Sequence, residues 1–119
     1  MSRPTTHTQR IWSAKNATAT AELDKEFRLC QSKIVELTLA GFSGTVDFQS
    51  KLEPDGAYAN CLYREIDVDP EGSDGVAQLS FTLITGVKRY LLIGARPHSQ
   101  IVMTRSAGTI SAIVYGHEE

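Results

Sequence analysis

The sequence predicts an all-β protein: a single antiparallel β-sandwich, immunoglobulin-like or jelly-roll-like, of about seven to nine short strands. Two observations lead to this prediction. From Gly41 to Tyr115, short segments with alternating or β-branched residues follow one another, and Gly, Asp and Pro turns separate them. The chain has 119 residues, the usual size of one domain with one hydrophobic core.

The first segment, residues 1–21, differs from the rest in composition. It is rich in Thr, Ser, Ala and Arg, and Ile11 and Trp12 are its large apolar groups. Such a segment buries too little surface to fold alone, so we expect an extended N-terminal arm that a neighbouring subunit holds through Trp12. The β-sandwich domain is then expected over residues 22–119. In the alternative, residues 11–20 form an edge strand of the same domain.

Residues 21–39 carry two overlapping patterns. Their apolar residues recur at helical spacing, whereas residues 34–39 show the β-branched enrichment and alternation of a strand. We expect strands over residues 26–30 and 34–39, because everything downstream is β and a long helix would lack a packing partner. A short helix over residues 21–29 is the alternative.

The next strands alternate with recognisable turns. Residues 44–50 alternate apolar and polar side chains, and Pro54-Asp55-Gly56 predicts a turn before a strand over residues 58–68. A polar loop over residues 69–75 then leads into a strand over residues 76–83.

The last strands follow the same rule. Thr85-Gly86 predicts a turn, and the unbroken apolar run Tyr90-Leu91-Leu92-Ile93 is typical of a strand covered on both faces. Residues 100–105 and 109–115 are expected to form a hairpin around Ser106-Ala107-Gly108, whose glycine accepts a positive φ.

Charge and cysteine content exclude several classes of protein. The chain has twelve Lys and Arg and fourteen Asp and Glu, so its net charge is slightly negative and we expect no basic face that binds nucleic acid. No apolar run approaches the ~20 residues that span a bilayer, and the polar N-terminal residues lack the apolar stretch of a secretory signal. Cys30 and Cys61 have no metal-ligand spacing, and we expect buried or free thiols rather than a disulfide.

We expect no catalytic, cofactor or metal site, because the sequence has no cluster of groups that could do such chemistry. His7, His98 and His117 lie far apart and do not pair at metal-ligand spacing. The stretch Asp67-x-Asp69-x-Glu71-Gly72 imitates the opening of a calcium loop, but Gln78 occupies the position of the bidentate Glu. We therefore interpret this stretch as a solvated turn.

Three stretches carry a resemblance to a known class of proteins. They are residues 42–50 with the turn Asp55-Gly56, the step Thr85-Gly86-Val87-x-Arg89-Tyr90, and Ile101-x-Met103-Thr104-x-Ser106-Ala107-Gly108-Thr109-Ile110-Ser111. Together they resemble small β-sandwich proteins encoded among the virion genes of tailed bacteriophages, over residues 34–115. This chain has Tyr58 where those proteins commonly place a tryptophan.

The resemblance implies a non-enzymatic virion structural protein, most directly a capsid decoration or cement protein that stabilises the head and is assembled in the host cytoplasm. The implied partners are the major capsid protein or other virion proteins, with a homo-oligomer, trimer or dimer, as the working form. A neck, tail or fibre-base component is an alternative. A carbohydrate-binding module that stacks Tyr58 or Tyr63 on sugar rings is a second kind of function.

Residue type indicates which side chains would make such contacts, because large aromatic residues and arginines dominate interface energetics. The expected interface residues are Arg10, Ile11 and Trp12 in the arm, with Arg89, Arg96 and Arg105 as charge partners.

Overall fold

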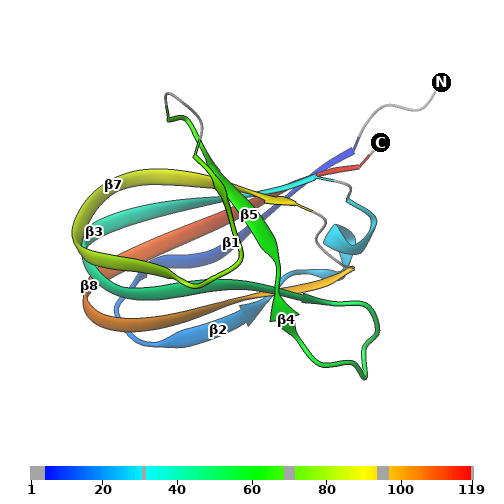
Figure 1. The fold of residues 1–119 in the computed structure, drawn as a ribbon, viewed down its shortest axis with the longest axis horizontal. Coiled ribbons are helices and arrows are strands. Elements are labelled where there is room, and N and C mark those ends of the chain that lie inside the picture. Colours follow the sequence, from blue (N-terminus) through cyan, green and yellow to red (C-terminus); the bar gives the residue numbers. More distant parts are fainter. Residues whose placement is uncertain (1–4, 31, 69–71, 94–96, 119) are drawn as a thin grey trace.

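The computed structural model describes residues 5–30, 32–68, 72–93 and 97–118, and it confirms the predicted all-β sandwich (Figure 1). In chain order the elements are β1 (Thr5–Lys15), β2 (Ala19–Glu22), the 3-10 helix η1 (Lys25–Leu29), β3 (Ser32–Lys51), β4 (Ala59–Asn60), β5 (Leu62–Ile66), β6 (Asp74–Gly75), β7 (Leu79–Ile93) and β8 (His98–Glu118).

The strands form one antiparallel sheet that folds over itself. Its order is β1-β8-β3-β7-β5-β6, with β2 beside β8 and β4 beside β3. Strands β3, β7 and β8 have 20, 15 and 21 residues, and each bends so that its two halves lie in different layers (Figure 1). The first layer contains β1, β5, β6 and residues 32–40, 86–93 and 109–118; the second contains β2, β4 and residues 42–51, 79–84 and 98–107.

The bend depends on glycine. The pairing of β3 with β8 shifts register between Ala40 and Gly44. Opposite this shift, Gly108 has a φ of +72°, and a Cβ there would overlap the carbonyl oxygen of Gly41. The Nε of Arg105 donates a hydrogen bond to the carbonyl oxygen of Gly108 at 2.7 Å. The two strands therefore approach too closely for any side chain at position 108.

Two predicted turns are wrong. Ser106-Ala107-Gly108 was expected as a hairpin and Thr85-Gly86 as a turn, but β8 and β7 run on through these positions. A glycine with positive φ serves a β-bulge as well as a hairpin turn, so the sequence pattern does not distinguish the two. The short strands predicted over residues 76–83, 100–105 and 109–115 are thus parts of long bent strands, whereas the strand predicted over residues 58–68 is divided into β4 and β5.

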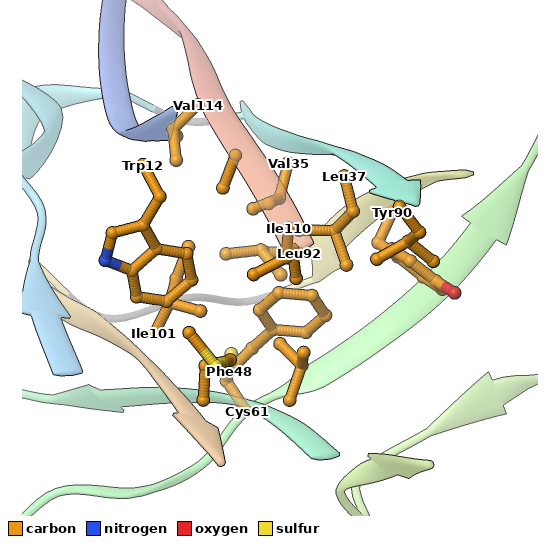
Figure 2. Packing of buried hydrophobic residues seen from close by; sticks show 14 of the residues in the cluster. Trp12, Val35, Leu37, Phe48, Cys61, Tyr90, Leu92, Ile101, Ile110 and Val114 are labelled. Carbon is orange, nitrogen blue, oxygen red and sulfur yellow. The ribbon is translucent and has the colours of Figure 1, made fainter. Parts of the chain in front are cut away.

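Residues 5–22 lie in the sheet and do not form a separate arm. Strand β1 pairs with the C-terminal end of β8, and β2 pairs with its N-terminal half. Trp12 is only 7% exposed and packs in the core of its own chain (Figure 2). The edge-strand alternative therefore holds, and the domain boundary predicted at residue 22 is corrected. An edge strand buries only alternate side chains, so few large apolar residues suffice.

Residues 25–29 form a 3-10 turn, and the strand predicted over residues 26–30 is wrong. The N–H of Phe27 donates to the carbonyl of Asp24 at 3.0 Å, and the N–H of Cys30 donates to that of Phe27 at 3.1 Å. Phe27 and Cys30 are three positions apart, so a 3-10 turn directs both inward, where both are buried. The strand predicted over residues 34–39 is confirmed as part of β3.

The core lies between the two layers. Phe48 of the second layer contacts Tyr63 and Tyr90 of the first, with ring centroids 5.6 Å away in both pairs. Figure 2 shows side chains from both layers meeting in this space. The buried apolar residues are Trp12, Phe27, Cys30, Val35, Leu37, Leu39, Phe42, Val46, Phe48, Cys61, Phe81, Tyr90, Leu92, Ile101, Met103, Ile110, Ala112 and Val114. Within the described ranges, no helix has the length and apolar character needed to cross a membrane.

Candidate interaction surface

The outer face of the first layer carries many apolar side chains. Residues paired directly across antiparallel strands point to the same face of a sheet. Ile34 of β3 lies between Tyr115 of β8 and Leu91 of β7, and all three alternate with residues of the core. This row therefore points away from the second layer.

The next row on this face mixes apolar and charged residues. Glu36 lies between Ile113 and Arg89, and the row continues to Arg10 in β1 and Ile66 in β5. We call this outer side of the first layer the apolar face. Its large apolar members are Ile34, Leu62, Ile66, Val87, Leu91, Ile93, Ile113 and Tyr115. Val87 is 51% exposed and Tyr115 36%, and the others are half-buried.

The outer face of the second layer is polar. Thr45 lies between Thr104 and Ser80, and Gln49 lies between Gln100 and Asn60. The Nε2 of Gln100 donates to the Oε1 of Gln49 at 2.7 Å. A solvated face of an antiparallel sheet is expected to be polar. The second layer follows this rule except at Val102, which pairs with Asp47 between these two rows, and the apolar face departs from it.

Ion pairs within the chain neutralise charges beside the apolar face. Arg89 donates from Nε to Glu36 and from Nη1 to Asp67, both at 2.8 Å. These hydrogen bonds, the one to Asp67 first, raise the pKa of Arg89. The Nε of Arg64 donates to Asp74 at 2.6 Å. Exposed pairs of this kind contribute little to stability, about 0–1 kcal/mol each, but they compensate each other's charge.

The predicted interface arginines fall in different places. Arg10 and Arg89 lie in the same row of the apolar face, on β1 and β7. Arg105 holds the bend of β8 through its bond to the carbonyl of Gly108. Arg96 lies outside the described residues.

The predicted apolar anchors serve the fold of their own chain. Trp12 is buried, and Ile11 packs against the core beside a register shift in β1. Neither is an exposed anchor, because the register shift between Arg10 and Trp12 breaks the alternation of β1, so that Trp12 pairs with Ala112 of the core and points between the layers.

The sequence analysis missed the apolar members of the face, although one signal pointed to them. The run over residues 90–93 predicts a strand covered on both faces. Tyr90 and Leu92 are covered by the second layer, whereas Leu91 and Ile93 point to the apolar face. Among the described residues, no element covers Leu91 and Ile93 as the second layer covers Tyr90 and Leu92.

A buried polar cluster lies inside the sandwich. Lys33 is only 2% exposed, and its Nζ donates to the Oγ of Ser99 at 3.2 Å. Burial lowers the pKa of Lys33, and the neighbouring Cys30 and Cys61 oppose this shift. Both cysteines are buried thiols, as expected, and burial raises the pKa of Cys61. A thiol with a raised pKa is mostly protonated at neutral pH and therefore a weak nucleophile.

The other groups singled out in the sequence have structural contacts. Asp67 accepts a hydrogen bond from Arg89, while Asp69 and Glu71 of the calcium-like loop lie outside the described residues. In the part of the chain that the structure describes, no three or more His, Cys, Asp or Glu are placed to hold a metal ion. Tyr63 is in contact with the core, and the ring of Tyr58 lies 4.4 Å from the Nζ of Lys51.

These features define a small antiparallel β-sandwich whose three long strands pass through both layers. The same fold occurs in the solved structure of the SPBc2 prophage-derived protein YomS, with a TM-score of 0.73 over 99% of this chain and 97% of that one. The two sequences are 11% identical, so the likeness concerns the fold. No protein-family model matches this sequence, and the comparison with curated proteins gives no match.

Proposed function

We propose that this protein is a non-enzymatic structural component of a phage particle, and that it acts by burying surface against other proteins. The apolar face is the observation that carries this proposal. Burying apolar surface contributes roughly 25 cal/mol per Å², so a face of this kind is a source of binding energy. The fold shared with a prophage-derived protein supports a phage setting.

Within the particle, we favour the role of a capsid decoration or cement protein. A small sandwich with two outer faces of different character offers separate surfaces to different neighbours. When one module contacts several capsid subunits at once, effective concentration makes modest interfaces add up to tight binding. The neck, tail and fibre base use the same physical means at other positions in the particle.

The test is to purify particles of the phage that encodes the chain and to locate the protein in them. We expect mass spectrometry to find it in a copy number comparable to that of the major capsid protein, and immunogold labelling to place it on the head. Particles that lack the gene product should release their DNA at a lower temperature, and adding the purified protein should reverse this. Labelling at the neck or tail would reassign the position, and absence from purified particles would overturn the proposal.

A further inference from the structure

We infer that the apolar face is the contact surface of a symmetric homodimer, in which the first layers of two copies pack face to face. The inference uses the same face that carries the proposed function and assigns it to a contact between two copies of this chain, which leaves the polar face and the sheet edges for other partners. The outer face of the second layer serves for comparison, because its mostly polar side chains are those expected on a solvent-exposed face of this protein.

The charges of the apolar face favour a second copy as the partner. Arg89 is paired with both Glu36 and Asp67, which leaves one negative charge in this group, and Arg64 is paired with Asp74. Together with the exposed Arg10 these groups carry no net charge, so the face does not call for a partner of opposite net charge. What remains between these pairs is apolar, and another apolar face is its best complement.

The unequal edges of the face determine how two copies would be oriented. The β1 edge carries Arg10, which is exposed, whereas Asp67 and Asp74 lie at the opposite edge with side chains that are 56% and 38% exposed. A twofold axis that lies in the interface and runs along the strands places β1 of one copy over β5 and β6 of the other. Arg10 then faces the acidic edge of its partner, whereas an axis across the strands would place Arg10 over Arg10.

The size of the face is close to that of a small dimer interface. The five strands from β1 to β5 in sheet order, spaced about 4.8 Å apart with about seven residues of 3.3 Å each, give a projected area of roughly 450 Å². Side chains corrugate this surface, so two copies would bury more than roughly 900 Å² in total, and specific stable interfaces begin at roughly 1,200 Å². Face-to-face packing of antiparallel sheets is the same arrangement that builds the core of each copy.

The experiment compares two substitutions on one strand. Ile113→Lys changes a half-buried β8 residue on the apolar face beside Glu36, and Val102→Lys changes a half-buried β8 residue on the polar face beside Asp47. Sedimentation velocity should find the wild type and Val102→Lys at twice the chain mass. Ile113→Lys should be monomeric, with dimerisation weakened at least about 100-fold, the effect of losing a central anchor.

Thermal unfolding and circular dichroism on the same samples show whether each variant is folded. A folded, monomeric Ile113→Lys beside a dimeric Val102→Lys supports the inference. A wild type that stays monomeric at high micromolar concentration overturns it, and so does a folded Ile113→Lys that remains dimeric. Neither result bears on whether the chain is found in phage particles, so the two proposals fail separately.

The orientation has its own test. Arg10→Glu should weaken the dimer about tenfold, and adding Asp67→Lys should restore much of the loss, because the exchanged charges again face each other while Glu36 still pairs with Arg89. If the double variant is weaker than Arg10→Glu alone, the orientation with β1 over β5 and β6 is wrong.

Discussion

At the scale of single residues, Lys33 is the side chain that least fits its surroundings. It occupies a core-facing position of β3, in line with Val35 and Leu37, and is almost fully buried. Its hydrogen bond to Ser99 offsets part of the cost of removing an ammonium from water. The lowered pKa of Lys33 indicates that the rest of this cost remains.

We therefore expect Lys33→Met to stabilise the protein by roughly 1–4 kcal/mol at neutral pH, the range for replacing buried ionic groups by hydrophobic ones. Because the pKa is lowered in the folded state, folded Lys33 loses its proton before the unfolded chain does as the pH rises toward 10.5. The wild type then gains stability relative to the variant. Urea unfolding at several pH values should show the advantage of Lys33→Met shrinking as the pH rises toward 10.5.

Lys88→Met is the matched control, because Lys88 belongs to the same layer but its side chain is 33% exposed, and its Nζ lies 3.5 Å from a carboxylate oxygen of Glu65. It should change stability by less than about 1 kcal/mol. An advantage of Lys33→Met that stays constant over the pH range would mean that the ammonium is not what destabilises the folded state.

At the scale of elements, the bend of the long strands is the feature on which the fold depends. Gly108 and Gly41 both have left-handed backbones, with φ of +72° and +56°. The two glycines differ in the room around them. A Cβ at Gly108 would overlap backbone atoms of β3, whereas no atom lies within 4 Å of a Cβ at Gly41. Comparing an alanine substitution at each position therefore separates the cost of backbone strain from the cost of steric overlap.

Gly41→Ala should cost only the left-handed penalty, about 1–2 kcal/mol. Gly108→Ala carries a similar penalty and in addition pushes β8 away from β3, so we expect a loss of more than about 3 kcal/mol or failure to fold. Urea unfolding of both variants measures the difference. Equal losses at the two positions would show that the close approach of the strands is not needed for the bend.

At the scale of the whole molecule, the sequence predicts the class of fold better than its connections. The alternation of residues 44–50 and the β-branched residues 34–39 depend only on near neighbours, so both strands could be predicted. Whether Gly108 turns the chain back or only bends it depends on the strand beside it, which is distant in sequence. The predicted hairpin is therefore wrong although the glycine was correctly singled out.

The residues of the candidate interaction surface were also hard to predict, because they are brought together by strands that are distant in sequence. Arg10 and Arg89 were predicted as interface residues because they are arginines. The surface itself, however, is formed by the residues that pair with them across the neighbouring strands. Ile113 points outward because it pairs with Glu36, and no local pattern reveals that pairing. In the sequence, only the apolar run over residues 90–93 indicated that both faces of a strand are covered.

The continuity of the long strands also predicts how the molecule unfolds. Because β3, β7 and β8 each cross from one layer to the other, neither layer can open and leave the other intact. Trp12, the single tryptophan, lies at the edge strand β1 and packs near Ile101 of the second layer (Figure 2). Its fluorescence therefore reports the core, while far-ultraviolet circular dichroism reports the sheet as a whole.

We expect the two signals to give one urea transition with a common midpoint. The measurement is best made on Ile113→Lys, so that association of chains does not contribute. A transition of Trp12 at a lower urea concentration than the dichroism would contradict this expectation. It would mean that β1 leaves the sheet on its own, and that residues 5–15 behave in solution as the arm that their composition first predicted.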